Sequence, residues 1–141
     1  LDDTKLLIVG GTHFEDQYSK DLMSLSTDNI IFAGKRTGKQ LFAIYRLAKL
    51  FILPSYHEGL PIVALEALSL SVPTLLSNIS PHTDIGLNTE NYFEIGNTHE
   101  LSKRLLLPFP EVIDKGPMLR KYNWTNIARE TKLLLEKCNR L

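Results

Sequence analysis

The chain of 141 residues is 43% hydrophobic and 23% charged, and its 16 basic residues match its 16 acidic ones. This length predicts one domain that buries a sizeable core. The matched charges argue against the basic stripe of a nucleic-acid-binding protein, so no nucleic acid is expected as a partner. The lone cysteine, Cys138, cannot form an internal disulfide, which favours a reducing compartment. No apolar run reaches the ~20 residues that span a bilayer.

Short apolar runs alternate along the chain with segments of helical periodicity. Buried strands are predicted at residues 6–9, 30–33, 50–53, 74–76 and 92–95. Helices are predicted at residues 16–26, 37–48, 61–71, 98–106 and 124–141, with Thr98 as the N-cap of the fourth. Residues 78–91 are expected to form a loop or turns, prolines break residues 108–117, and Trp124 with the leucines after it is expected to be core. The alternation indicates an α/β fold with a parallel sheet covered by helices on both faces.

Chemistry is expected at the carboxyl ends of the strands, where ligands bind in folds of this kind. The predicted strand at residues 50–53 ends where one such stretch begins. This stretch, residues 53–77, has the sequence LPSYHEGLPIVALEALSLSVPTLLS. Glu66 is the only charged residue between Gly59 and Leu76, and a lone carboxylate in apolar surroundings is costly unless it is paired or hydrogen-bonded. Glu58 lies eight residues earlier, in the polar loop before the predicted helix. Two acids in this arrangement suggest a binding site.

The start of that helix is a candidate anion site. Its unpaired backbone N–H groups and the positive end of the helix dipole favour a phosphate. Gly59 lets the backbone approach a ligand closely, and Pro61, a residue favoured at the first helical position, removes one donor. The candidate donors are then the amides of Gly59, Leu60, Ile62 and Val63. Glu66, in the second turn, suits paired hydroxyls such as a ribose diol, and Glu58 suits hydroxyls beyond the phosphates.

The residue types alone leave a plainer interpretation open. Glu58 can favour the helix N-terminus without binding anything, and Glu66 can pair with a lysine or arginine across the sheet. The pair Gly10-Gly11, after the first predicted strand, is either a simple turn or a donor-facing stretch of backbone. His57 adjoins Glu58 and is either a lining residue of the site or an exposed loop residue.

Other motifs give less. The sequence GKRTGKQ at residues 34–40 is one residue short of a phosphate-binding loop and lacks its final serine or threonine, so we reject that interpretation. The four histidines, at positions 13, 57, 82 and 99, show no metal-ligand spacing. No G-x-S-x-G nucleophile elbow is present.

The segment Glu58-GLPIVAL-Glu66 is an E-x7-E arrangement inside LPS-x2-EGLP-x4-EAL-x4-P. It resembles the retaining glycosyltransferases of family 4, in the GT-B superfamily, where this motif marks the C-terminal nucleotide-sugar-binding domain. The runs LLIVGG and IIFAGK, Gly96-Asn97 before ELSKRL, and YNW at residues 122–124 are also similar to that family. The likeness covers nearly the whole chain. It implies a Rossmann-like three-layer α/β/α domain with a mostly parallel sheet, the C-terminal half of a GT-B fold.

The resemblance implies a role for each matching position. Glu66 would bind the nucleotide ribose, and Glu58, the candidate catalytic residue, would contact hydroxyls of the donor sugar. Gly34 and Lys35 would lie near the base, and the rest of the donor site would be the backbone at Gly59, Leu60, Pro61 and Ile62. The reaction would move a sugar from a nucleotide diphosphate to an acceptor with retained anomeric configuration. No metal and no cofactor are implied, and UDP-, GDP- and ADP-linked donors all stay open.

Some positions depart from the family pattern. Many members read EGFGLP, whereas Pro61 stands here in place of the second glycine, and EGLP variants also occur. Ser71 stands where glycine is usual before Val-Pro. The family's domain also begins with a central strand and an Arg/Lys pair that holds the diphosphate, and both would precede Leu1, as would the N-terminal acceptor domain. We therefore expect a fragment that folds incompletely alone and transfers no sugar.

Three functional hypotheses follow. The first is the donor-binding part of a retaining glycosyltransferase whose acceptor is a growing polysaccharide or a lipid-linked glycan. The second is a non-catalytic Rossmann-like nucleotide-binding or regulatory domain, and the third is a sugar-nucleotide epimerase of GT-B architecture. The first predicts a cytoplasmic protein, with peripheral association at the inner face of the membrane left open.

Overall fold

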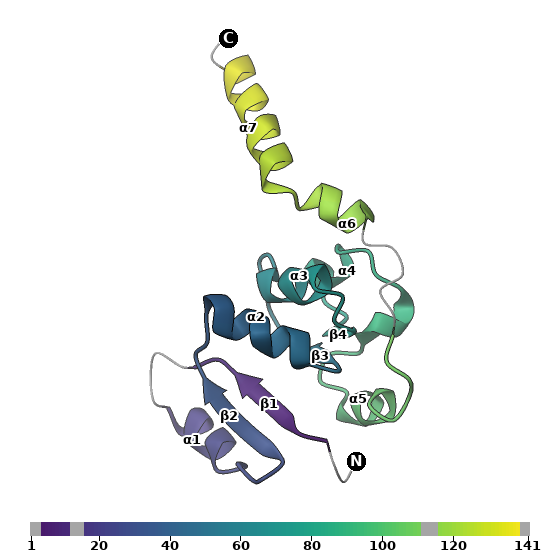
Figure 1. Cartoon of the computed structure of the whole chain (residues 1–141). Helices are drawn as coiled ribbons and strands as arrows, with labels where there is room; N and C mark the ends of the chain where they lie inside the picture. The colour runs from purple at the N-terminus through teal and green to yellow at the C-terminus, as the bar shows by residue number, and fades with distance from the viewer. Residues whose placement is uncertain (1–3, 12–15, 111–115, 139–141) are drawn as a thin grey trace. The chain divides into compact units, whose positions relative to one another are not determined.

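The computed structural model describes residues 4–11, 16–110 and 116–138. Its elements follow the order β1-α1-β2-α2-β3-α3-β4-α4-η1-β5-α5-α6-α7 (Figure 1). The chain divides into two compact units, Leu1–Ile44 and Tyr45–Leu141. The boundary between them lies within helix α2 (Gly38–Leu47). The predicted α/β fold with parallel strands is confirmed.

The first unit contains two parallel strands, β1 (Leu6–Val9) and β2 (Ile30–Gly34), joined through helix α1 (Gln17–Met23). Asp16 is the N-cap of α1, and hydrogen bonds from the hydroxyl and amide of Ser19, at 2.6 and 2.7 Å, lower the pKa of its carboxyl group. A glycine, Gly10, follows β1, and β2 ends at Gly34. Gly34 has a φ of 65°, a left-handed conformation that favours glycine, and its carbonyl accepts from the Gly10 N–H at 3.1 Å.

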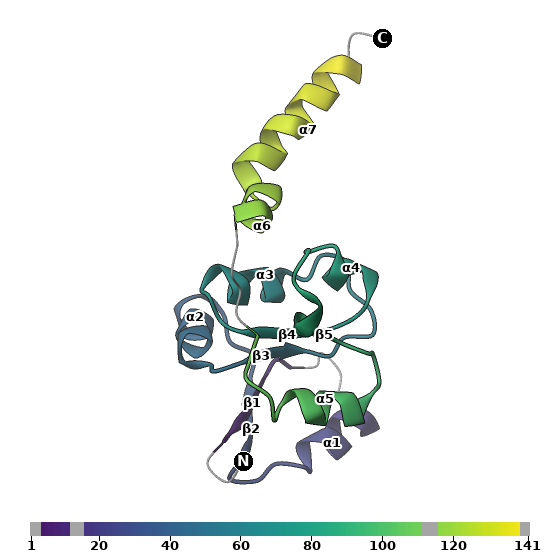
Figure 2. The same cartoon turned by 90° about the vertical axis from the view of Figure 1, so that its right-hand side faces the viewer.

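The second unit contains a parallel sheet in the order β3-β4-β5, formed by β3 (Phe51–Leu53), β4 (Thr74–Ser77) and β5 (Tyr92–Phe93). Helices α3 (Ile62–Ser69) and α4 (Ser80–Thr83) lie on one side of this sheet, and α5 (Thr98–Arg104) lies on the other (Figure 2). Leu76 packs with Ala64 and Leu68 of α3 in the main buried cluster. Helices therefore cover both faces of the sheet, as predicted. Among the described residues the strands pair within two sheets, one in each unit.

Helix α3 ends in a Schellman motif, which its residue pattern did not predict. The Val72 N–H donates to the Ala67 carbonyl at 3.1 Å, and the Ser71 N–H donates to the Leu68 carbonyl at 3.0 Å. This geometry requires a left-handed residue at position 71, and Ser71 has a φ of 64°. The usual glycine at this position in the similar family is thereby explained, because glycine adopts that conformation without steric cost.

Several predicted boundaries are wrong by a residue or a turn. Pro61 is the N-cap of α3 and not its first helical residue, since its ψ of 70° is not helical. Asn97, not Thr98, caps α5, and its side-chain oxygen accepts from the Glu100 N–H at 2.9 Å. Residues 78–91, predicted as a loop or turns, contain a 3-10 turn, Thr89–Asn91, but also the short helix α4, which was not predicted. Helix α6 (Gly116–Lys121) was missed because Pro117 suggested a break, although proline is tolerated in a first helical turn.

The last helix, α7 (Trp124–Cys138), forms where predicted, and residues 139–141 lie outside the described residues. Its expected burial is wrong. Trp124 is 70% exposed, and the exposed fractions of Leu133, Leu134 and Leu135 are between 52% and 63%. A helical period of apolar residues indicates a face that can be covered, but it does not say whether the covering partner belongs to the same fold.

We predict that Ser71→Gly stabilises the protein. The substitution relieves a left-handed residue, at a gain of roughly 1–2 kcal/mol, partly offset by about 0.5–1 kcal/mol for the extra freedom of glycine in the unfolded chain. The free energy of unfolding, measured by urea denaturation, should therefore rise by about 0.5–1 kcal/mol. The matched control is Ser69→Gly at the end of α3, which should lower it. A loss of stability in Ser71→Gly would contradict this explanation of the Schellman motif.

Candidate functional site

The loop after β3 places Glu58 at the carboxyl end of the sheet. The Ser55 hydroxyl donates to Glu58 Oε1 at 2.8 Å, and the Ser55 carbonyl accepts from the hydroxyl of Ser77, the last residue of β4, at 2.6 Å. Glu58 is half-buried. It lines an open hollow of about 370 Å³ together with Tyr56, His57, Asn78, Ile79, Ser80 and Pro81. The predicted loop acid is thus held in place beside a space that a ligand can enter.

The start of α3 presents part of the predicted set of amide donors. In the part of the chain that the structure describes, the N–H groups of Gly59 and Leu60 have no hydrogen-bond acceptor, and both residues are exposed. Val63 lies in the first turn of α3, where an N–H group has no acceptor within the helix. The Ile62 N–H differs, because it donates to the Leu60 carbonyl at 2.8 Å. Two loop amides and one helical amide therefore remain for an anion.

Glu66 lies in the second turn of α3, as predicted, and is half-buried. Its Oε2 accepts from the hydroxyl of Tyr45 in α2 at 3.2 Å, and the same hydroxyl lies 3.2 Å from the Val63 carbonyl. Burial, and then the negative charge of Glu66, raises the pKa of the Tyr45 hydroxyl well above its ordinary value. Tyr45 is itself buried and packs edge-on against the Phe51 ring, with the ring centroids 5.8 Å apart. The lone acid of the helix is therefore hydrogen-bonded to a tyrosine rather than paired with a base.

The structure also brings together the four predicted residues of the first unit. Gly10 and Gly34 are hydrogen-bonded at the ends of β1 and β2, and a Cβ built on Gly11 would lie 4.0 Å from the Lys35 backbone nitrogen. Lys35 is exposed. These residues share the carboxyl edge of their sheet, which is where the sequence predicted them, and their contact with a base stays a prediction.

Sequence reasoning missed Ser55, Ser77 and Tyr45. The first two had a usable signal, since each is a small polar residue at or just beyond the end of an apolar strand, at the edge where ligands bind. Tyr45 had no such signal, because an aromatic residue within a helical period is typical of an ordinary core residue.

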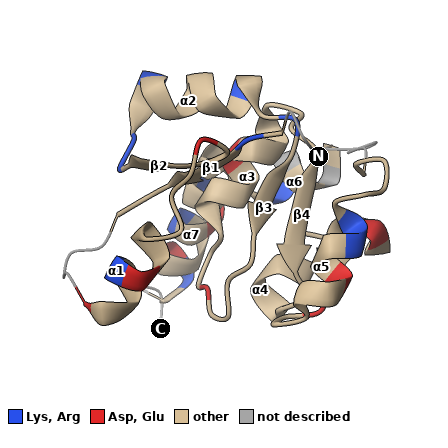
Figure 3. Ribbon diagram, turned by 90° about the horizontal axis from the view of Figure 1, so that it is seen from below, with Lys and Arg blue, Asp and Glu red and all other residues tan. Residues whose placement is uncertain are grey.

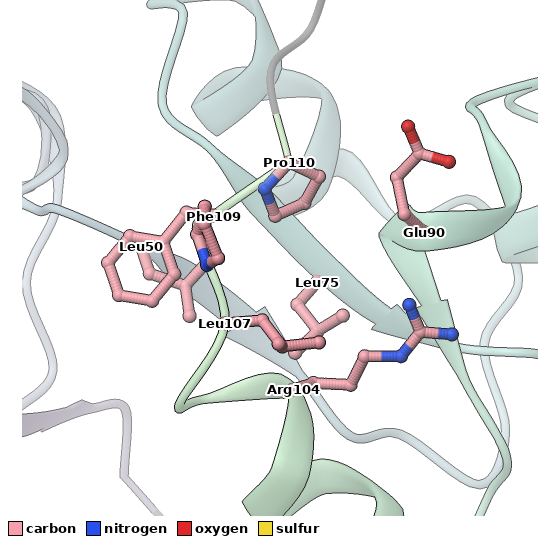
Figure 4. A pocket seen from close by; sticks show the side chains of 8 residues that line it. Leu50, Leu75, Glu90, Arg104, Leu107, Phe109 and Pro110 are labelled. Atoms are coloured by element: carbon pink, nitrogen blue, oxygen red, sulfur yellow. The ribbon is translucent and has the colours of Figure 1, made fainter.

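A second hollow, of about 340 Å³, lies beside the start of β3, and none of the predicted site residues lines it. Leu50, Leu75, Leu107 and Phe109 form an apolar wall, with Arg104 and Glu90 to one side (Figure 4). Arg104 is already engaged, since it pairs with Glu100 at 3.5 Å. This hollow offers no cluster of polar groups for an anion or a sugar.

Two helices away from the loop after β3 carry charges of both signs. Basic and acidic side chains are mixed on α1 and α5 (Figure 3). Within the described ranges, no three histidine, cysteine, aspartate or glutamate residues gather as a metal site. No helix in the same ranges is long and apolar enough to cross a membrane.

Comparison with known proteins identifies the family. The model of the family "Glycosyl transferases group 1" matches residues 1–107. An uncharacterized glycosyltransferase of Methanocaldococcus jannaschii is 30% identical over 141 residues, which cover 92% of this chain and 36% of that protein. The chain therefore belongs to the group 1 glycosyltransferases, and its parallel α/β architecture agrees with a Rossmann-like domain of the GT-B superfamily.

Two other relatives match shorter parts of the chain. A serotype-specific mannosyltransferase of Escherichia coli is 46% identical over 56 residues, covering 40% of this chain and 7% of that protein. The alpha-galactosylglucosyldiacylglycerol synthase of Streptococcus pneumoniae is 36% identical over 70 residues, covering 50% of this chain and 19% of the synthase. The chain thus spans well under half the length of these relatives.

We predict that Tyr45→Phe removes a stabilising contact while keeping the ring packing. The lost hydroxyl should cost about 0.5–1.5 kcal/mol at neutral pH. Because the pKa of Tyr45 is raised in the folded state, its contribution is present below the ordinary tyrosine pKa of ~10 and is lost as the pH rises above that value.

An alkaline titration followed by tyrosinate absorbance tests this prediction. Tyr45→Phe should remove the absorbance that develops last, whereas the same substitution at exposed Tyr18 should keep it. If Tyr45→Phe instead loses its share of the absorbance in the ordinary tyrosine range, and the last-developing part stays, Tyr45 is not held protonated by its surroundings.

Proposed function

We propose that this chain supplies the donor site of a retaining family 4 glycosyltransferase and binds a nucleotide-diphosphate sugar. One observation carries the proposal: Glu58 is fixed by a hydrogen bond beside an open hollow, next to the exposed amides that precede α3. A nucleotide-diphosphate sugar carries groups that match both, namely sugar hydroxyls for the carboxylate and a diphosphate for the amides.

Each acid keeps one oxygen for a ligand. Ser55 occupies Oε1 of Glu58, which leaves Oε2 for a hydroxyl of the donor sugar. Tyr45 occupies Oε2 of Glu66, which leaves Oε1 for the ribose diol. Both carboxylates are half-buried, so their hydrogen bonds to a ligand would be less exposed to competing water than those of a surface acid.

Gly59 supports close approach of a phosphate. Its φ is not positive, and a Cβ built on it would meet no atom within 4 Å, so neither backbone strain nor packing requires glycine at this position. A ligand resting against the backbone explains it better. The amides of Gly59 and Leu60 would then also stabilise the charge that grows on the diphosphate as the bond from the sugar carbon to its oxygen breaks.

The acceptor is proposed to be a growing polysaccharide or a lipid-linked glycan. The names of two relatives support these two kinds of acceptor, since one is a serotype-specific mannosyltransferase and the other is an alpha-galactosylglucosyldiacylglycerol synthase. The acceptor would bind a domain outside these 141 residues, because the relatives are much longer than the part that matches.

We predict that Gly59→Ala leaves the fold intact and weakens donor binding. Alanine fits the backbone conformation of Gly59 and should raise the free energy of unfolding by about 0.4–1 kcal/mol. Its methyl group would point into the space that a diphosphate must occupy, so affinity for the donor should fall at least about tenfold. Thermal shift with UDP-, GDP- and ADP-sugars identifies the donor, and calorimetry then measures the affinity of each variant.

The matched control is Gly86→Ala, at a turn far along the chain from the loop, which should leave donor affinity unchanged while lowering stability through its φ of 81°. Glu66→Ala should weaken binding of the nucleoside diphosphate itself. If no nucleotide sugar stabilises the wild type, or if Gly59→Ala binds the donor as tightly as the wild type, the proposed donor site is wrong.

We predict that transfer activity separates this proposal from a non-catalytic binding domain. The 141-residue chain alone should transfer no sugar, whereas the full-length protein with the identified donor should glycosylate a glycan or lipid-linked acceptor with retained anomeric configuration. Donor binding without transfer by the full-length protein would favour the non-catalytic domain, and turnover by the 141-residue chain would contradict the need for a second domain.

A further inference from the structure

A buried histidine lies behind the loop that carries Glu58. His82, in α4, is fully buried, and its Nδ1 lies 2.8 Å from the Ser77 carbonyl oxygen. Because a carbonyl only accepts, Nδ1 must carry a proton. His82 Nε2 has no hydrogen-bond partner among the described residues, so a proton there would be a buried and unpaired donor. The structure therefore favours the neutral tautomer with the proton on Nδ1.

The hydrogen bonds between His82 and Glu58 all have their donors on the His82 side and their acceptors on the Glu58 side. The Ser77 hydroxyl gives its proton to the Ser55 carbonyl at 2.6 Å, so toward His82 Nδ1, at 3.2 Å, it can only accept. The Ser55 hydroxyl in turn donates to Glu58 Oε1 at 2.8 Å. Each serine hydroxyl donates to one acceptor, and the Nδ1–H faces two acceptors of the same residue, Ser77, which favours a single arrangement of the loop.

The backbone of His82 is held independently of its ring. Its carbonyl accepts from the Tyr92 hydroxyl at 3.2 Å, and that hydroxyl accepts from the Leu87 N–H at 3.0 Å. Strand β5 and the segment after α4 thus fix the position from which the imidazole reaches Ser77.

Stability alone does not explain an imidazole at this position. An unpaired buried nitrogen costs free energy, and an apolar side chain of similar size would avoid that cost. What the imidazole adds is the Nδ1–H that holds the end of β4.

We propose that His82 is a positioning residue for Glu58 and acts through Ser77 and Ser55. The inference rests on the proposed function, in which Glu58 contacts the donor sugar. Glu66 and Tyr45 take no part in these hydrogen bonds. Loss of the His82 donor should therefore affect recognition of the sugar and leave recognition of the nucleotide unchanged.

The binding test compares His82→Leu with His82→Asn, whose amide N–H can take the place of the Nδ1–H. The measured quantity is the ratio of the dissociation constants of the nucleoside diphosphate and of its sugar derivative. His82→Leu should lower this preference for the sugar by about fivefold, with binding of the nucleoside diphosphate unchanged. His82→Asn should restore part of it. Thr83→Ala, an exposed position on the same helix, is the control and should match the wild type.

A second arm needs no ligand and separates failure of this inference from failure of the proposed function. Long-range proton–nitrogen NMR spectra should show the proton on His82 Nδ1, and the carboxyl carbon signal of Glu58 should move in His82→Leu but not in Thr83→Ala. A proton on Nε2, or an unmoved Glu58 signal, overturns the inference even if donors bind. If no nucleotide sugar binds the wild type, the proposed function fails, and the NMR signals alone decide whether His82 positions Glu58.

Two outcomes remain informative. Equal weakening of the nucleoside diphosphate and the nucleotide sugar by His82→Leu would make His82 a structural residue and overturn the inference.

If His82→Leu does not fold, Ser55→Ala and Ser55→Thr replace it. Loss of the sugar preference in Ser55→Ala, together with its retention in Ser55→Thr, supports the hydrogen-bonded chain. Equal sugar preference in these two variants contradicts the hydrogen-bonded chain.

Discussion

The second unit depends on strand β4, which pairs in parallel with β3 on one edge and with β5 on the other. All four of its residues are buried. Leu76 packs into the cluster formed with α3, while Leu75 lies on the opposite face of the sheet because side chains alternate along a strand. The last residue, Ser77, reaches across to the carbonyl of Ser55. One short strand therefore sets both the packing of the layers and the position of the loop that holds Glu58.

The two acids of the E-x7-E arrangement, Glu58 and Glu66, lie in different surroundings. Glu58 accepts from a loop serine and faces an open hollow, whereas Glu66 accepts from the hydroxyl of Tyr45, a buried residue of α2. In the proposed donor site these two surroundings would serve two parts of one ligand, with Glu58 at the sugar and Glu66 at the nucleotide. The plainer interpretation of Glu66 as the partner of a lysine or arginine finds no such pair among the described residues.

The strands and most helices could be predicted because short apolar runs and helical periods are local signals. The predicted strand at residues 74–76 and the helix after Pro61 differ from the structure by about a residue. Non-local features could not be read in this way. The hydrogen bonds among Ser55, Ser77 and His82 join residues from three elements, and the exposure of α7 depends on what it packs against rather than on its own pattern. The left-handed conformation of Ser71 was indicated only by the glycine that is usual at this position in the similar family.

The single-domain assignment, the upstream central strand and the contact of Gly34 and Lys35 with a base stay predictions. The central claim is narrower: the loop and helix start at residues 58–63 bind a nucleotide-diphosphate sugar. An NMR titration with the donor found by thermal shift tests it most directly. The amide signals of Gly59, Leu60 and Val63 should shift most strongly and saturate together, while that of Ile62, whose N–H already donates to the Leu60 carbonyl, should shift less. Saturable binding that leaves these amides unmoved would contradict it.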